Sequence, residues 1–221
     1  MRWMVLSFFV FAAPGQVDAG AWAREKGEVF IATGGNFLLS DGAQLPVHYD
    51  PTLYIEYGLS PLITVGLDYY TADQGRIDTG LIFARFPLGN VTGRDRLAAS
   101  LAFGARVDEF SPVESLIRGG LLWGRGLNNG WLAIDYSATY GDIDQVFRSK
   151  ADFTWGYNLT DRWTSTLQLQ SGEGFDEDVY AKINPGIIFR VNDNYRVSVG
   201  AVRAFTGDKG SALKLDIWAK F

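Results

Sequence analysis

The last nine residues of the chain alternate between two kinds of side chain and end on an aromatic residue. The apolar set is Leu213, Leu215, Ile217, Ala219 and Phe221, and the set between them is Lys214, Asp216, Trp218 and Lys220. Side chains two positions apart in a strand share one face, so this segment has an apolar face and a largely charged face. The same period recurs from residue 28 onward, in segments that reach the roughly 9–11 residues needed to cross a bilayer as a tilted strand. The pattern predicts an all-β fold, a closed antiparallel up-and-down transmembrane β-barrel.

The first residues of the chain predict export. Arg2 precedes an apolar stretch over residues 3–13, which is shorter than the roughly 20 residues of a membrane-spanning helix and fits the core of a signal peptide. Val17 and Ala19 supply the small or apolar side chains that a signal peptidase reads, so we expect cleavage after Ala19. The chain then divides into a signal peptide (1–19), a periplasmic segment (20–27) and the barrel (28–221).

Composition excludes several other classes of protein. The chain has no cysteine, which excludes a disulfide framework and a thiolate metal site. With 26 Gly, 15 Phe, 10 Tyr and 7 Trp against 7 Pro, it favours strands and tight turns. No run of about 18 apolar residues is present, which excludes a helical membrane protein. The net charge is −5 with no basic run, so we expect no nucleic-acid partner, and no cofactor or metal motif is found.

About twelve segments have the alternation of a strand. They are residues 28–38, 52–59, 62–70, 77–86, 96–107, 116–123, 131–140, 146–159, 163–171, 179–191, 195–205 and 212–221. The first and sixth alternate most weakly, so ten strands remain the alternative. An even number places both chain ends on the periplasmic side, where we expect short turns.

Three features indicate which face of these strands meets lipid. Small residues crowd the polar face, as expected inside a narrow cylinder: Gly58, Gly66, Gly80, Ala84, Ala98, Ala102, Gly104, Gly120, Ala133, Gly156, Gly186 and Gly200. The middles of the apolar faces are nearly free of charge, as at Ile63, Val65 and Leu67.

Pro185 lies in the middle of one such face and cannot donate a ladder hydrogen bond, so we expect a bulge or a lost bond there.

Aromatic side chains gather near strand ends, which is the third feature. One set is Tyr57, Phe86, Trp123, Trp131, Trp155, Tyr157, Trp163, Phe189, Tyr195 and Phe221, and the other is Tyr69, Phe110, Tyr140, Phe147, Phe175 and Phe205. Two aromatic belts at the headgroup levels are typical of transmembrane barrels. The apolar face is therefore predicted to point outward.

Two motifs carry a resemblance to known families. Leu215, Ile217, Ala219 and Phe221 resemble the C-terminal signal of Gram-negative outer-membrane barrels, which implies recognition by the barrel-assembly machinery and location in the outer membrane. Residues 20–27 (GAWAREKG) and 53–60 (LYIEYGLS) are similar to the family of outer-membrane transporters associated with the meta-pathway of phenol degradation. That resemblance implies transport of a small solute.

Alternation assigns a set of charged side chains to the lumen. They are Glu56, Asp68, Asp78, Arg106, Arg118, Asp135, Arg148, Lys150, Asp152, Lys182, Arg190, Arg196, Lys214 and Asp216. Acidic groups predominate in the second to fourth strands and basic groups in the last five, which would set a field across an open pore. The alternative is that these groups pair with one another and fill the interior.

The leading hypothesis is a narrow, passive outer-membrane channel, and an occluded structural barrel is the alternative. Barrel size does not decide between them. Eight strands leave room only for side chains and sixteen leave an aqueous channel, and the predicted twelve strands fall between these cases. Asp68 and Asp78 could lie opposite each other and hold a cation, or pair with neighbouring arginines. The outer loops are acidic and short, and could share divalent ions with lipopolysaccharide.

A lipid-modifying enzyme is not expected. The single histidine, His48, is predicted to lie in the first outer connection, and no Gly-x-Ser-x-Gly motif is present. Nothing in the sequence brings Ser40 or Ser111 to His48, the adjacent base that such an enzyme would need.

Overall fold

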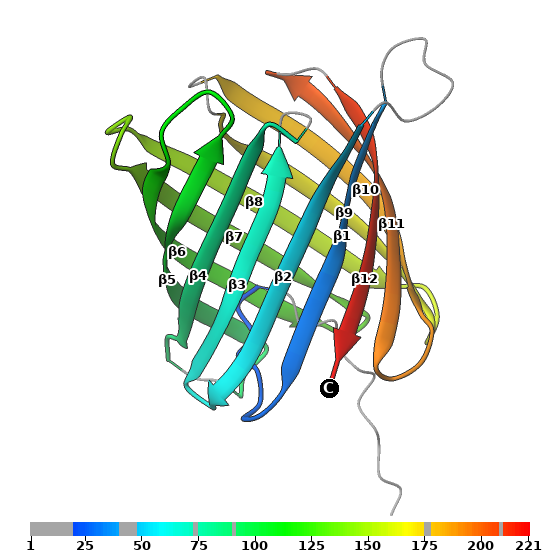
Figure 1. Ribbon diagram of the computed structural model, residues 1–221. Coiled ribbons are helices and arrows are strands. Elements are labelled where there is room, and N and C mark those ends of the chain that lie inside the picture. The colour runs from blue at the N-terminus through cyan, green and yellow to red at the C-terminus, as the bar shows by residue number, and fades with distance from the viewer. Residues whose placement is uncertain (1–19, 40–47, 73–74, 90–91, 175–177, 208–209) are drawn as a thin grey trace, which may run out of the picture.

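The computed structural model describes residues 20–39, 48–72, 75–89, 92–174, 178–207 and 210–221. In these residues the chain forms twelve antiparallel strands, each paired with its neighbours in sequence, and β1 also pairs with β12 to close the barrel (Figure 1). The strands are β1 (Val29–Leu39), β2 (His48–Ser60), β3 (Ile63–Ala72), β4 (Ile77–Pro87), β5 (Asp95–Asp108), β6 (Glu114–Leu127), β7 (Gly130–Gly141), β8 (Phe147–Asn158), β9 (Trp163–Glu173), β10 (Val179–Arg190), β11 (Tyr195–Thr206) and β12 (Ser211–Lys220). No helix in this part of the chain is long and apolar enough to cross a membrane.

The predicted up-and-down barrel of twelve strands is confirmed, and the alternative of ten strands is wrong. Both segments with weak alternation are strands, β1 and β6. β6 extends beyond its predicted bounds at both ends, and its alternation is weak because Gly119, Gly120 and Gly124 carry no side chain whose polarity could alternate. His48 is the first residue of β2, so its prediction as part of a loop is corrected.

The two ends of the barrel differ in their connections. At the end where β1 begins and β12 stops, which we call the terminal end, Val29 and Phe221 exchange two backbone hydrogen bonds of 3.0 and 2.9 Å. Four of the five connections at this end have two to four residues, and the fifth, between β4 and β5, has seven. We call the opposite end the loop end. The short turns expected beside the chain ends are therefore present.

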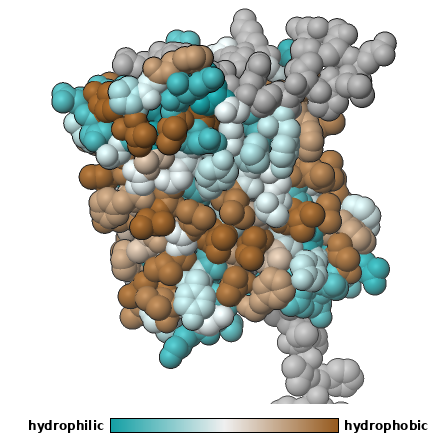
Figure 2. Space-filling model, viewed as in Figure 1, coloured by the Kyte–Doolittle hydropathy of each residue, from teal (hydrophilic) through white to brown (hydrophobic). Residues whose placement is uncertain are grey.

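The outer wall of the barrel is apolar. Ile82 is 66% exposed, and Leu101, Ile134 and Val199 are also exposed although they lie in the middle of strands. Figure 2 shows hydrophobic side chains across the middle of the barrel wall and hydrophilic groups near its two ends. An apolar outer band with polar ends is the arrangement that a bilayer requires of a spanning barrel.

The face of β4 is the reverse of the one predicted. Ile77, Leu81 and Phe83 point inward and are buried, and in register Phe83 lies opposite Gly66 and Ala102. The predicted inward residues Asp78, Gly80 and Ala84 share the face of the exposed Ile82 and point outward. Both faces of this strand are largely apolar, so apolarity alone could not identify the outer one.

Most of the predicted belt aromatics lie on the outer wall near strand ends. At the terminal end Trp163 packs on Phe189 with ring centroids 4.5 Å apart, and near the loop end Tyr140 packs on Phe147 at 4.9 Å. Trp131 is the exception: it is buried inside the barrel. Its place in the belt is therefore corrected, while Phe175 lies outside the described residues.

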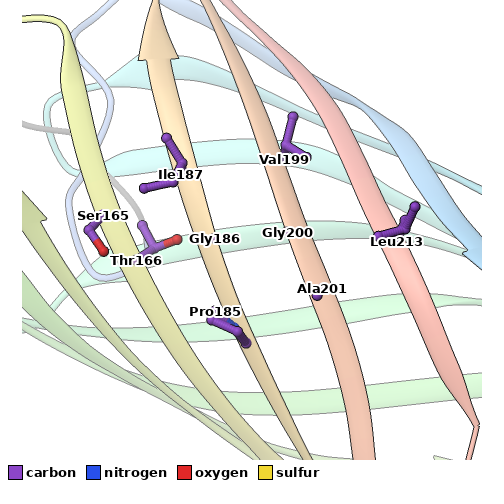
Figure 3. Close-up of a pocket in the computed structure, with 9 residues that line it drawn as sticks. All are labelled: Ser165, Thr166, Pro185, Gly186, Ile187, Val199, Gly200, Ala201 and Leu213. Carbon is purple, nitrogen blue, oxygen red and sulfur yellow. The ribbon is translucent and has the colours of Figure 1, made fainter.

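The pairing of β10 with β11 is irregular near Pro185, as the sequence predicts. The register shifts between Ala181 and Lys182, and Asn184 and Pro185 have no partner in it among the described residues. On the outer wall the same place is a shallow groove of about 420 Å³ (Figure 3). The groove exists because Pro185, Gly186, Gly200 and Ala201 present little side-chain volume there.

Candidate functional site

The barrel interior contains a segment of the chain that precedes β1. Residues 20–27, which we call the lumen segment, turn at the terminal end and run back behind β2 and β3 (Figure 1). Trp22 is 7% exposed and packs against Trp131, Ala133 and Ile188, with Trp218 beside them. Ala21 packs against Ala98 and Leu122. These apolar contacts hold the lumen segment inside the terminal end. The alternation of apolar and polar side chains along the strands does not predict them.

A buried ionic cluster fixes the other half of the lumen segment. Glu56 of β2 is 1% exposed and lies between two guanidinium groups, those of Arg24 and Arg85. Arg24 Nε donates to Glu56 Oε2, and Arg85 Nη1 lies 2.7 Å from Glu56 Oε1. Arg85 Nη2 also donates to the Tyr54 hydroxyl at 2.6 Å, and that hydroxyl donates to Glu56 Oε1 at 2.6 Å. Because buried ions need partners, this cluster ties the lumen segment to the barrel wall.

Arg24 has further partners on its own side of the lumen. Its backbone N–H donates to Thr64 Oγ1 at 3.1 Å, and its Nη1 lies 3.2 Å from Glu28 Oε1. Glu28 also pairs with Lys220 Nζ at 3.1 Å, and the Arg24 guanidinium lies 4.3 Å from the centre of the Phe30 ring. Glu28, just before β1, thus links Arg24 of the lumen segment to the last strand of the barrel.

Two glycines of the wall make room for the lumen segment. A Cβ on Gly124 would overlap the Trp22 ring, and a Cβ on Gly58 would overlap the carbonyl of Glu25. The small residues that the sequence places on the inner face therefore serve, at these two positions, to admit a second layer of chain.

The middle of the lumen contains paired rather than segregated charges. Arg118 Nη2 donates to Asp68 Oδ2 at 2.6 Å, across β3 and β6. Lys150 lies 2.8 Å from Asp152, and Lys214 lies 3.6 Å from Asp216, each within one strand. The predicted basic strands therefore carry their own carboxylates, as the pairing alternative expected.

Three lysines nevertheless line the wall towards the loop end. Lys150, Lys182 and Lys214 are each the fourth residue of their strand, β8, β10 and β12, counted from that end. The Lys150 side chain is 46% exposed and the Lys214 side chain is 32% exposed, although both point inward. Lys182 Nζ lies 4.9 Å from the centre of the Tyr180 ring. The interior is therefore open beside these lysines, in contrast to the filled terminal end.

The remaining predicted lining residues are placed as follows. Asp135 lies opposite Asp152 in the register of β7 and β8, and Arg190 lies opposite Arg196 near the terminal end. Asp78 lies on the outer face, where its Oδ1 accepts from the Tyr69 hydroxyl at 2.8 Å and from Thr71 Oγ1 at 3.0 Å. The predicted pairing of Asp78 with Asp68 is therefore wrong. No cluster of three or more His, Cys, Asp or Glu suited to a metal occurs in the part of the chain that the structure describes.

Known structures with similar barrels support the assignment of the fold. The KdgM porin, solved in complex with disordered oligogalacturonate, matches with a TM-score of 0.59 and 9% identity, covering 88% of this chain and 99% of that one. Omp33 of Acinetobacter baumannii matches with a TM-score of 0.53 and 8% identity, covering 89% and 99%. The chain has the fold of an outer-membrane β-barrel. No family model and no curated protein sequence matches it.

No comparison confirms the predicted resemblance to phenol-pathway transporters, but the two motifs on which it is based contact each other. Residues 20–27 and 53–60 meet through Arg24 and Glu56. The Gly27 N–H also donates to the Gly58 carbonyl at 2.7 Å. The two motifs therefore form one structural unit, in which the lumen segment packs against β2.

Near the loop end, a second ionic cluster joins β5, β6 and the connection between β7 and β8. Arg106 Nη2 lies 2.5 Å from Glu114 and 2.7 Å from Asp144, and Arg148 Nη2 lies 2.7 Å from the same Asp144 oxygen. The hydrogen bonds from Arg148 and Arg106 hold the pKa of the Asp144 carboxyl below its ordinary value.

The lowered pKa of Asp144 predicts an acid-sensitive connection between β7 and β8. A carboxyl whose pKa is depressed by folding contributes stability above its unfolded pKa, about 3.9, and this contribution is lost as the pH falls through the folded value. We expect protection of the Gln145 amide, which donates to the Gly141 carbonyl at 3.1 Å, to decrease only below about pH 4. Hydrogen exchange measured against pH checks this, and Asp144→Asn should remove the acid step. An unchanged acid step in that variant would contradict the assignment.

Proposed function

We propose that the protein is a narrow passive channel of the outer membrane for small hydrophilic or weakly amphipathic solutes. The observation that carries the proposal is the exposure of Lys150 and Lys214 on the inner face of a closed barrel. These inward lysines stay exposed although each lies near a carboxylate, and ionic groups inside a barrel are costly unless water or further partners surround them, so water is expected beside them. The half of the lumen towards the loop end is therefore a water-filled vestibule.

The direction of insertion follows from the position of the chain ends. With the terminal end in the periplasm, the exported chain loses residues 1–19 there and presents Leu215, Ile217 and Phe221 to the barrel-assembly machinery. The vestibule then opens to the outside of the cell, beside lipopolysaccharide. Solutes enter the vestibule first and meet the lumen segment last.

The three lysines of the vestibule favour solutes that carry a negative charge or a strong dipole. Positive groups aligned along one wall raise the local concentration of anions in a narrow, low-dielectric passage. The carboxylates of Asp152 and Asp216 beside two of these lysines moderate this preference. Weak anion preference is therefore the expected selectivity.

Substitution of Lys182 tests the proposal. In planar bilayers the protein should give stable conductance, and Lys182→Glu should shift the reversal potential in a salt gradient towards cation preference, because it reverses a charge on the vestibule wall. Arg162→Glu is the matched control, since Arg162 is exposed in the turn between β8 and β9 and the same charge change lies outside the lumen. Equal selectivity in the two variants would contradict the role of the lysines.

A filled barrel without transport is the second candidate function. The observation that favours it is the packing of the terminal end by Trp22, Trp131 and the Glu56 cluster. No conductance at high protein dose, with correctly folded barrels in the bilayer, would establish this alternative and refute the channel.

A further inference from the structure

The tip of the lumen segment touches a carboxylate in the middle of the barrel. Gly20 lies against Asp135 of β7, so closely that a Cβ on Gly20 would be 2.7 Å from Asp135 Oδ1 and 3.1 Å from Oδ2. Gly20 also has a φ of +72°, in the left-handed region. A residue with a side chain would therefore be strained in its backbone and would collide with the carboxylate. The chain is built to bring the main chain of residue 20 to Asp135.

The Asp135 carboxylate has one buried oxygen, Oδ1, without a hydrogen-bond donor among the described residues. Asp135 lies directly opposite Asp152 in the register, and Asp152 has its own partner in Lys150 at 2.8 Å. Two carboxylates on opposing residues of neighbouring strands disfavour joint ionisation unless a cation lies with them. Arg85 and Lys150 attract the Asp135 charge, but neither donates to its Oδ1, so a positively charged donor fits this place.

Processing of the chain would supply that group. Cleavage after Ala19 converts the amide nitrogen of Gly20 into an α-ammonium with three donors. We propose that the new N-terminal ammonium of Gly20 forms an ion pair with Asp135 inside the lumen and so locks the lumen segment in place. The proposal rests on cleavage after Ala19, and it holds whether the lumen conducts or is filled.

The lock can form only after processing. In the uncleaved chain the nitrogen of Gly20 is a neutral amide with one donor, and Asp135 is attracted by Arg85 and Lys150 without forming an ion pair with either of them. In the mature chain, the lumen segment is held at three points along its length: Gly20 on Asp135, Trp22 in its apolar cluster, and Arg24 on Glu56. Removal of the signal peptide is thereby coupled to closure of the terminal end.

A zero-length crosslink tests the contact directly. A carbodiimide activates a carboxylate, and an adjacent amine then displaces the urea to form an amide. In the mature protein purified from outer membranes, we expect an amide between the Gly20 amine and the Asp135 carboxyl, detected by mass spectrometry after trypsin. The crosslink should be lost in Asp135→Asn and unchanged in Asp193→Asn, because Asp193 is exposed in the turn between β10 and β11.

A second variant guards against misfolding of Asp135→Asn. Insertion of Ser-Gly after Ala19 keeps every residue of the barrel but moves the ammonium by up to about 7 Å, so the crosslink to Asp135 should also disappear there. Mass spectrometry of the intact protein must find Gly20 as the first residue of the unmodified chain. A different first residue, no crosslink in the folded mature protein, or an equal crosslink in the extended variant would each overturn the proposal. Bilayer conductance is a separate measurement, so its absence would refute the channel without affecting the ion pair.

Discussion

Replacing Glu56 with alanine is expected to destabilise the folded barrel by about 3–5 kcal/mol, the cost of leaving buried charges without their partner. Glu56 is the carboxylate that both Arg24 and Arg85 contact, and all three side chains are buried. Its loss would leave two guanidinium groups facing each other inside the barrel. Arg24 would keep Glu28, whereas at this cluster Arg85 would keep the neutral Tyr54 hydroxyl at 2.6 Å.

Urea unfolding of the protein in lipid vesicles, followed by tryptophan fluorescence, measures this loss. Asp95→Ala is the matched control, because Asp95 pairs with Arg125 at 3.6 Å but both side chains are about half exposed. Exposed ion pairs contribute about 0–1 kcal/mol, so the control should change stability little. If the two variants unfold at the same urea concentration, the Glu56 cluster does not stabilise the barrel in the way described.

The barrel was predictable because its outer wall faces one kind of environment along its whole length. A lipid-facing position must be apolar, so the strands β5, β7 and β12 show the period of two without interruption. β4 shows the limit of this argument. Its inner face is also apolar, because Leu81 and Phe83 pack with Ala102 and Leu116, and the period then no longer distinguishes inside from outside.

The lumen segment was not predictable for a different reason. Residues 20–27 have neither the period of a strand nor that of a helix, and their partners lie on β2, β3, β5, β6, β7, β10 and β12. Two signals were present in the sequence. Trp131 belongs to the inner face by the parity of β7, and Arg24 and Glu56 carry opposite charges in two segments that the fold brings together.

The sequence predicts which charged side chains point into the lumen, but it does not predict which of them form ion pairs with one another. Alternation places Asp68 and Arg118 inside, yet only the register and the closed shape bring their side chains to 2.6 Å. Likewise, alternation does not show that Glu56 lies in the filled part of the lumen and Lys150 in the open part. That distinction depends on the lumen segment, which occupies one end only.

Releasing the lumen segment is expected to raise the conductance several-fold. In the double variant Trp22→Ala, Arg24→Ala, the segment loses its apolar anchor and its link to β2. Arg85 still pairs with Glu56 at 2.7 Å, so no carboxylate is left unpaired and the barrel itself should stay folded. Single-channel recording in planar bilayers measures the effect, with heat-modifiable migration on gels as the check that the barrel is folded.

Trp163→Ala is the matched control for that variant. Trp163 lies near the same end of the barrel but on the outer wall, packed on Phe189, so its loss removes the same ring volume from the lipid side. Conductance of the double variant equal to that of the control would show that the lumen segment does not limit passage.

Opening the terminal end should also leave ion selectivity unchanged. Lys150, Lys182 and Lys214 lie in the half of the barrel towards the loop end, whereas Trp22 and Arg24 lie at the terminal end. Removing the constriction widens the passage without moving the charges that choose the ion, so conductance and selectivity should respond to different substitutions. If the double variant conducts more, and adding Lys182→Glu to it no longer shifts the reversal potential, one constriction sets both the conductance and the ion selectivity.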